Sequence, residues 1–551
     1  MTRGFILHPS YRVTAGRPVV RIHGVLESGR SFLILDDRAV PRFWVRESDA
    51  DRARELGANV RPADRPRRTM RGAPVVPVEL VRPSDTPAIR DKLIDHGIST
   101  YEADVRFAYR YLIDRGIRAS VEIRGESTPG EGVDAVFRNP DVRPTDWSPE
   151  LRVLSIDIET DPSLERVLSI AVVGCGVSDV LLMTPEGWSC PGGAIPFRTE
   201  RELLLDFVRR VRALDPDVIT GWNVVGFDFT VLLKIAERCR VTLGIGRGGD
   251  PVQVRPGAGP RASPEARMAG RVVLDGMDLV RGAFLRFESY SLNNVASEVL
   301  GEQKLIHGVD RAGEILRTFK EERDTFVEYN RSDARLVLDI IDRLELMDLT
   351  VERCRLTGMP PDRVAASIAS FDFLYLSELG RRGMVAPSVQ PWVLSEETTG
   401  GHVLEPEPGL HRNVFVFDFK SLYPSVIRTF NIDPLGYFSE PTDDEDPLVA
   451  PNGARFRREP GILPAMLDEF FPRREAAKKA GRRAGDLAIK ILMNSFYGVL
   501  GSTSCRFSAP ALANAITGFG REILLWSKAR FEAAGHRVLY GDTDSLFVEA
   551  G

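Results

Sequence analysis

The chain has 551 residues, of which 43% are hydrophobic, and this is enough apolar material for the cores of roughly three to five domains. Its five cysteines are scattered and never spaced as C-x-x-C, which excludes a disulfide framework and a cysteine zinc site. A net charge of −5 excludes a uniformly basic DNA-coating protein and confines any contact with nucleic acid to local patches.

Residues 1–150 alternate short β-forming runs, such as 19–25 and 31–35, with breaks rich in Arg, Pro, Gly and Asp. This pattern predicts a mixed, β-rich N-terminal domain without a chemical motif. Its cluster of arginines is either a patch for a phosphate backbone or, as we favour, a solvated loop. The cluster comprises Arg61, Arg65, Arg67, Arg68 and Arg71.

Residues 151–365 alternate strands with helix-length amphipathic stretches, at 200–213 and 318–346, which is typical of an α/β domain. A stretch rich in Gly, Pro and Arg, residues 244–270, predicts an insertion loop. The composition shifts after Pro361, so we expect the next domain to begin near residue 366.

A predicted strand at residues 152–160 carries two acids. The strand period of two puts Asp157 and Glu159 on one face. Two carboxylates this close repel each other, and that cost is normally tolerated where cations lie between them. Taken alone, the segment is equally compatible with an edge strand whose acids are solvated.

Two further motifs follow in the same domain. The string G-W-N-V-V-G-F-D ends at Asp228, and the string Y-N-R-S-D places Tyr329 and Asp333 at i and i+4, on one face of a helix. With the first pair of acids, these strings resemble the three exonuclease motifs of the DEDD superfamily, in the subgroup that uses tyrosine. The resemblance implies an RNase H-like 3′→5′ exonuclease domain.

The same resemblance implies which residues act. Four hard oxygen donors suit two Mg²⁺ ions, with Mn²⁺ as an alternative, and such ions generate hydroxide from water. The four implied metal ligands are Asp157, Glu159, Asp228 and Asp333. Tyr329 is implied to orient the attacking water. Asn223 and Phe227 are implied to hold the end of the DNA strand.

A second set of acids lies near the end of the chain. Residues 413–418 form a β-forming run, predicted to be buried, that ends in Asp418 and needs a polar partner there. Residues 538–548 predict two short strands around a G-D-T-D turn with Asp542 and Asp544 at its tip. A D-T-D hairpin by itself is also compatible with a turn that has no chemistry.

A predicted helix at residues 487–498 separates these two segments. Lys490, Asn494 and Tyr497 lie on one face at i, i+4 and i+7, while apolar residues form the other face. Upstream, Arg474 and Lys478 are again i and i+4, and both residue types bind phosphate. The neighbouring cations are interpreted as solvent-facing: Arg473, Lys479, Arg482 and Arg483.

These segments resemble motifs A, B and C of family B DNA polymerases, down to the S-L-Y-P-S and Y-G-D-T-D-S strings, with the bacterial polymerase II branch most similar. The resemblance implies a palm at 366–464 and 511–551 and helical fingers at 465–510. Asp418 and Asp544 are implied to bind two Mg²⁺ ions beside Asp542, and Thr543 to contact DNA. The implied nucleotide-binding residues are Ser421, Leu422, Tyr423, Arg474, Lys478, Lys490, Asn494 and Tyr497.

The implied function is DNA-directed DNA synthesis with proofreading, in replication or repair, using primer–template DNA and dNTPs. The alternatives are an exonuclease with an impaired polymerase half and a noncatalytic DNA-binding factor, although the intact acids argue against the latter. Family members continue beyond motif C, so we expect Gly551 to leave this chain without a thumb or a tail that binds the sliding clamp. Without a signal peptide or an apolar run of membrane length, we expect a cytoplasmic, nucleoid-associated protein.

One departure from the family pattern lies before motif A. Family members commonly have a tyrosine two residues before the Gly400-Gly401 pair, where this chain has Thr398. How a DNA strand moves between the two sites is therefore open.

Overall fold

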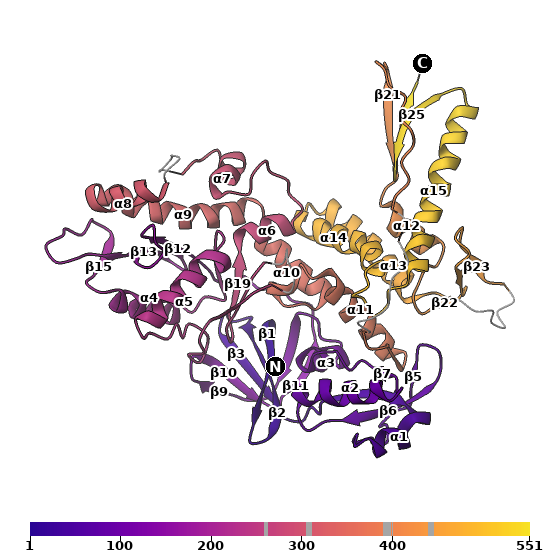
Figure 1. Cartoon of the computed structure of the whole chain (residues 1–551), viewed down its shortest axis with the longest axis horizontal. Coiled ribbons are helices and arrows are strands. Elements are labelled where there is room, and N and C mark those ends of the chain that lie inside the picture. Colours follow the sequence, from indigo (N-terminus) through magenta and orange to yellow (C-terminus); the bar gives the residue numbers. More distant parts are fainter. Residues whose placement is uncertain (258–262, 305–310, 390–397, 399, 439–445, 551) are drawn as a thin grey trace. The chain divides into compact units, whose positions relative to one another are not determined.

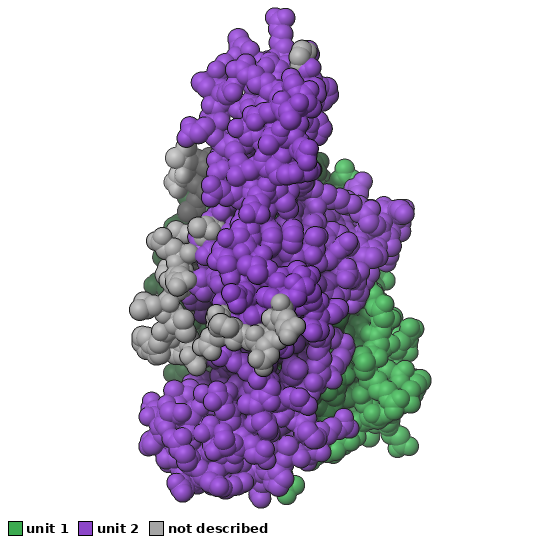
Figure 2. Space-filling view, turned by 90° about the vertical axis from the view of Figure 1, so that its right-hand side faces the viewer, with its two compact units in different colours: residues 1–39, 107–365 green, residues 40–106, 366–551 purple. Residues whose placement is uncertain are grey.

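The computed structural model describes the whole chain except residues 258–262, 305–310, 390–397, 399, 439–445 and 551. It divides into two compact units, which Figure 2 shows in green and purple. Unit 1 comprises residues 1–39 and 107–365, and unit 2 comprises residues 40–106 and 366–551. The predicted multidomain α/β class is confirmed, whereas the finer division into five domains stays a prediction.

Unit 1 begins with a seven-stranded sheet in the order β11-β8-β1-β2-β3-β10-β9 (Figure 1). The predicted strands at 19–25 and 31–35 are confirmed within β2 and β3. Phe5, Ile22 and Phe32 are among the buried residues of this sheet. Its strands are β1 (Thr2–Thr14), β2 (Arg17–Leu26), β3 (Ser31–Asp36), β8 (Ser120–Arg124), β9 (Ser127–Gly130), β10 (Val133–Arg138) and β11 (Asp141–Pro144), and helix α3 spans Phe107–Asp114.

The second sheet of unit 1 has the order β15-β14-β13-β12-β16-β19, so β12 lies inside it. β12 pairs antiparallel with β13 and parallel with β16. Because Leu154, Ile156 and Ile158 are buried, this strand is held firmly in the core. The strands are β12 (Val153–Thr160), β13 (Val167–Gly174), β14 (Val177–Met183), β15 (Ala194–Phe197), β16 (Val218–Gly221) and β19 (Val272–Asp275).

Helices cover both sides of this sheet. Figure 1 shows α9 on one side and α4 and α5 on the other, and α9 packs directly on β12 and β13. The predicted helix at 200–213 is confirmed as α4 (Glu200–Leu214), which begins with a capping box between Thr199 and Glu202. The predicted helical stretch at 318–346 is divided between α8 (Arg311–Glu321) and α9 (Arg323–Arg343); α5 spans Thr230–Arg238.

The expected insertion loop at residues 244–270 contains a short antiparallel pair, β17 (Gln253–Arg255) and β18 (Glu265–Arg267). Residues 258–262 between these strands lie outside the described part. Helices α6 (Gly276–Gly282), α7 (Leu292–Leu300) and α10 (Leu346–Thr357) complete unit 1, together with the short turns η3 (Val225–Phe229) and η4 (Pro361–Arg363).

Unit 2 contains a five-stranded sheet built largely from residues 40–106, in the order β20-β5-β6-β4-β7. Arg506 joins this sheet to the later part of the chain, since its buried guanidinium binds Asp104 at 2.7 Å and Asp372 at 2.9 Å. Of the arginine cluster noted in the sequence, Arg67 packs over Trp44 and the other four are exposed. The elements are β4 (Arg42–Arg46), β5 (Arg67–Thr69), β6 (Pro74–Glu79), β7 (Thr100–Tyr101) and β20 (Met384–Val385), with α1 (Ala50–Glu55), α2 (Thr86–Asp95) and α11 (Ser367–Arg381).

The last part of unit 2 is a three-stranded sheet, β21-β26-β25, with α15 packed on β25 and β26 (Figure 1). The predicted hairpin is confirmed as β25 (Arg537–Asp542) and β26 (Ser545–Glu549). The elements around it are β21 (Val414–Asp418), α12 (Leu422–Thr429), α13 (Ile462–Lys479), α14 (Arg483–Leu500) and α15 (Pro510–Ala533), together with the small sheet of β22 (Tyr437–Phe438), β23 (Leu448–Val449) and β24 (Arg455–Phe456).

The prediction that the strand before Asp418 is buried is wrong. Every residue of β21 is exposed, and Phe415 and Val416 each retain 57% of their accessible surface. Among the described residues, β21 pairs with β26 alone, so it is an edge strand with one open side. A β-forming composition therefore predicted the strand correctly but not its surroundings.

Within the described ranges, no helix combines the length and apolar character needed to cross a membrane.

Candidate functional site

Three acids of the first predicted set lie close together in the structure. Asp157 and Glu159 lie on one face of β12, and Asp333 comes from α9, which packs across that strand. One carboxylate oxygen of each residue lies within 4.8 Å of the others, and among the described residues this is the group of three acids that could hold a metal ion. Glu159 and Asp333 are buried and Asp157 is half-buried.

Asp228 lies beside this group on the turn η3. Its Oδ1 accepts a hydrogen bond of 3.0 Å from the backbone N–H of Ile158, which lies between the two acids of β12. Burial, and then the neighbouring Asp157 carboxylate, raise the pKa of Asp228 well above its ordinary value. Asp228 thus lies close enough to Asp157 for the two carboxylates to repel each other, and a bound cation would relieve that repulsion.

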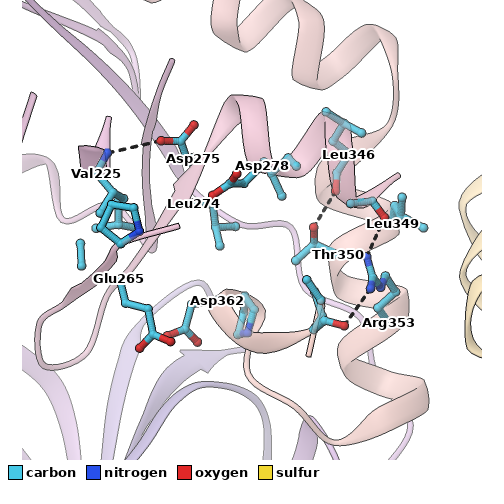
Figure 3. Close-up of a pocket in the computed structure, with 18 residues that line it drawn as sticks. Val225, Glu265, Leu274, Asp275, Asp278, Leu346, Leu349, Thr350, Arg353 and Asp362 are labelled. Carbon is cyan, nitrogen blue, oxygen red and sulfur yellow. Dashed lines mark hydrogen bonds between the residues drawn. The ribbon is translucent and has the colours of Figure 1, made fainter. Parts of the chain in front are cut away.

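The turn that carries Asn223, Phe227 and Asp228 is held by a residue that the sequence analysis missed, Asp275 at the end of β19. Its carboxylate accepts a hydrogen bond of 3.0 Å from the backbone N–H of Asn223. It accepts a second, of 3.4 Å, from the backbone N–H of Val225 (Figure 3). Asn223 has φ +60°, a left-handed conformation that such bonds help to maintain. Burial, and then Asp278, raise the pKa of Asp275 to about 6.

Asp275 also lines a cavity of about 110 Å³ in unit 1, shown in Figure 3. The cavity is walled by apolar side chains such as Leu274 and Leu349 and by the acids Asp278 and Asp362. Neither Asp157 nor Asp333 lines it, so it is separate from the acidic cluster. The carboxylate of Asp275 therefore supports the turn through its hydrogen bonds to the backbone.

Lys304 is a second residue that the sequence analysis missed. Its buried ammonium forms an ion pair with Asp333 and lies 5.6 Å from the ring centroid of Tyr329. Tyr329 is itself fully buried, one helical turn before Asp333 on α9. A lone lysine before a stretch that is not described, residues 305–310, offers no periodic or spacing signal, which is why it was overlooked.

The donor set of this cluster fits Mg²⁺ or Mn²⁺. Carboxylate oxygens are the ligands that these hard cations prefer. Lys304 pairs with one of the acids, Asp333, and the carboxylates of Asp157, Glu159 and Asp333 offer oxygens within 4.8 Å of one another. Such a group of oxygens can hold a divalent cation.

The second acidic set lies at one end of the three-stranded sheet β21-β26-β25. Asp418 on β21 and Asp542 on β25 are both register partners of Ser545 on β26, so the two acids flank one residue. Thr543, at the tip of the turn, has φ +54°. Partial burial, and then the carboxylate of Asp418, raise the pKa of Asp544. Among the described residues these three acids do not form a group as tight as that in unit 1.

Arg474 connects the elements next to this end of the sheet. Its largely buried guanidinium donates to Asp486 Oδ1 at 2.7 Å and to Ser421 Oγ at 3.1 Å. Ser421 directly precedes Leu422 and Tyr423 at the start of α12, and the ring of Tyr423 lies 4.6 Å from that of Tyr497 on α14. Four of the predicted nucleotide-binding residues are therefore linked in pairs, Arg474 with Ser421 and Tyr423 with Tyr497.

The two faces of α14 are as the sequence predicts. Lys490 and Asn494 are exposed and Tyr497 is half-buried, whereas Ile489 and Phe496 on the opposite side are buried. Lys478 on α13 is exposed as well. The cations interpreted as solvent-facing are all exposed: Arg473, Lys479, Arg482 and Arg483.

Comparisons with known proteins give two family-model matches. The model described as DNA polymerase family B, exonuclease domain, matches residues 98–295, and the model described as DNA polymerase family B matches residues 365–551. A DNA polymerase of Archaeoglobus fulgidus is 30% identical over 580 residues, which cover 99% of this chain and 70% of that protein. The chain belongs to DNA polymerase family B.

Two other relatives show how far this family B chain extends. DNA polymerase II of Escherichia coli is 40% identical over 467 residues, 83% of this chain but 58% of that protein. The structure of the family B DNA polymerase from Pyrobaculum calidifontis matches with a TM-score of 0.82 at 28% identity, over 100% of this chain and 75% of that one. The chain thus spans little more than half of the Escherichia coli relative.

Proposed function

We propose that unit 1 is a metal-dependent 3′→5′ exonuclease that removes nucleotides from the end of a DNA strand. The carrying observation is the cluster of Asp157, Glu159 and Asp333, whose oxygens lie within 4.8 Å of one another, with Asp228 beside it. Buried acids held this close cost free energy unless a cation offsets their charge. The match to the exonuclease-domain model supports the assignment.

In this proposal, the four acids hold two Mg²⁺ ions. When bound, the ions supply a hydroxide nucleophile and stabilise the leaving oxygen of the phosphodiester. Tyr329 orients the attacking water from α9. Asn223 and Phe227, on the turn supported by Asp275, hold the 3′ end of the strand. The ammonium of Lys304 keeps Asp333 in place and limits the repulsion among the acids.

The test is degradation of a 5′-labelled single-stranded oligonucleotide by the 551-residue chain, with and without Mg²⁺. We expect a ladder of products shortened from the 3′ end that disappears when EDTA removes the metal. Intact substrate in the presence of Mg²⁺ or Mn²⁺, from protein whose melting transition is cooperative, would show that the assignment is wrong.

Unit 2 supports a second activity, DNA-directed transfer of nucleotides from dNTPs to a primer 3′-OH. Here Asp418 and Asp544 bind two Mg²⁺ ions beside Asp542, and Thr543 contacts DNA. The observation that favours it is the pairing of Arg474 with Ser421 and of Tyr423 with Tyr497. Primer extension on a matched and a mismatched primer separates the alternatives.

The three outcomes of that extension assay are distinct. Extension of the matched primer with removal of the mismatch supports both activities. Degradation of both primers without extension favours an exonuclease with an impaired polymerase half. DNA retention with neither reaction favours a noncatalytic binding factor. The proposed partners are primer–template DNA and dNTPs, and the proposed location is the cytoplasm, at the nucleoid, as expected for a relative of a bacterial polymerase.

A further inference from the structure

A residue that is not one of the four acids forms hydrogen bonds to one of them, Asp157. Asn330 lies on α9 directly after Tyr329, and its side chain is fully buried. Its amide nitrogen donates to Asp157 Oδ2 at 2.7 Å and also lies 3.2 Å from the backbone oxygen of the same residue. One NH₂ group therefore bridges the main chain and the carboxylate of Asp157.

The orientation of this amide is set by a third residue. Ser169 on β13, also fully buried, donates its hydroxyl to Asn330 Oδ1 at 2.7 Å. Because the backbone oxygen and the carboxylate of Asp157 both accept hydrogen bonds, the amide nitrogen faces Asp157 and the amide oxygen faces the serine hydroxyl, which donates to it. Ser169 is also the register partner of Glu159 across the β12–β13 ladder, so the bridge is anchored beside the second acid of the strand.

This bridge limits the motion of a metal ligand. A carboxylate bonded only to water rotates about its Cα–Cβ bond, whereas one held at its own backbone and at Oδ2 keeps a single orientation. A carboxylate fixed in advance binds a cation without losing that rotational freedom. Groups that orient metal ligands in this way typically change metal affinity or activity by about 10–100-fold when they are removed.

We propose that Asn330, oriented by Ser169, is a positioning residue that sets the affinity of the exonuclease site for its divalent cations through Asp157. The inference rests on the proposed exonuclease function. It adds a residue that touches neither the cation nor the DNA and acts through its hydrogen bond to a ligand.

The experiment measures metal binding as well as activity. Mn²⁺ binding to the full chain is followed by calorimetry without DNA, in an Asp418→Asn background that weakens the polymerase site. In parallel, Mg²⁺ is titrated against degradation of single-stranded DNA. The variants are Asn330→Ala, the isosteric Asn330→Asp and Ser169→Ala. Glu328→Gln, exposed on the same helix, is the matched control, and Asp157→Asn with Glu159→Gln defines the signal without the site.

We expect Asn330→Ala to raise the half-saturating concentration of both metals by about 10–100-fold, with the rate at saturating Mg²⁺ recovering to within a few-fold. Asn330→Asp should be at least as weak, because an ionised carboxylate cannot donate to Asp157. Ser169→Ala should shift the same constant by less. Glu328→Gln should bind as the parent does.

Unchanged metal constants in folded Asn330→Ala would overturn the inference while leaving the exonuclease intact. If Asn330→Ala fails to fold, Ser169→Ala decides, and an unshifted metal constant there overturns it equally. A parent chain that binds Mn²⁺ through Asp157 but degrades no DNA would instead refute the proposed function, and the binding constants would still test the role of Asn330.

Discussion

The two acidic sites of this chain differ in how far their carboxylates are exposed to solvent. In unit 1, Glu159, Asp228 and Asp333 are 6%, 2% and 1% exposed. The backbone N–H of Ile158 holds Asp228, and Lys304 holds Asp333. In unit 2, Asp418 and Asp542 are exposed at the end of a three-stranded sheet in which β21, within the described part of the chain, pairs on one side only. Both sites use carboxylates, but only the first encloses them.

The difference in exposure affects how firmly the side chains of each site are fixed in position before metal, DNA or nucleotide binds. Charges interact strongly in the low-dielectric interior of a protein. Buried carboxylates therefore form strong hydrogen bonds and repel one another strongly unless a cation is bound. Exposed carboxylates are screened by water and depend on what else binds them. We therefore expect the exonuclease site to be preorganised, and the polymerase site to acquire its order from DNA and nucleotide.

The largest expected effect separates the two sites outright. Asp157→Ala with Glu159→Ala should reduce degradation of single-stranded DNA to the background of the assay, because two of the four metal ligands are lost. Primer extension should be unchanged, since β12 belongs to unit 1. Both rates are measured on one preparation. Normal digestion by the double variant would mean that the first site is misassigned.

The reciprocal change tests the exposed site. Asp418→Asn or Asp544→Asn should remove nucleotide incorporation, because the attacking and leaving oxygens both need charge stabilisation from metals held there. Degradation should persist. Single-nucleotide incorporation at the parent rate in either variant would contradict the assignment of these two acids.

A smaller effect is expected at Tyr423, whose ring packs against Tyr497 at 4.6 Å. We expect this ring to occupy the space that a ribonucleotide 2′-OH would need, so Tyr423→Ala should lower the preference for deoxynucleotides by about 10-fold or more. The ratio of deoxy- to ribonucleotide incorporation is the measurement, with Tyr423→Phe, which keeps the ring, as the control. An unchanged ratio in Tyr423→Ala would argue against this role.

An effect on KM, rather than on incorporation itself or on sugar selection, should come from a single cation on the exposed face of α14. Lys490→Ala should raise KM for dNTP by about 10-fold or more, as expected for a hydrogen bond to a charged group worth roughly 1.5–3 kcal/mol. Lys479→Ala, exposed at the end of α13, is the matched control and should leave KM unchanged. Equal effects of the two substitutions would indicate a general charge contribution rather than a nucleotide contact.

Local patterns predicted the parts of both sites that depend on neighbours in sequence. The period of a strand put Asp157 and Glu159 together, the G-D-T-D turn predicted the hairpin of β25 and β26, and helical spacing predicted the exposed face of α14. Each of these features is decided by backbone geometry over a few residues. They also carried the resemblance to family B.

Long-range contacts decided the rest. Asp275, Lys304 and Asn330 lie on separate elements, and each reaches the acidic cluster or its supporting turn only because the sheet and α9 bring them there. The exposure of β21 could not be read from its apolar composition, since an edge strand and a central strand have the same β-forming residues. The sequence by itself determined the acids, their faces and the family, because these follow from local periodicity and residue chemistry. Only the tertiary structure decided which acids are enclosed and which residues hold them, because burial and hydrogen bonding depend on segments far apart in the chain.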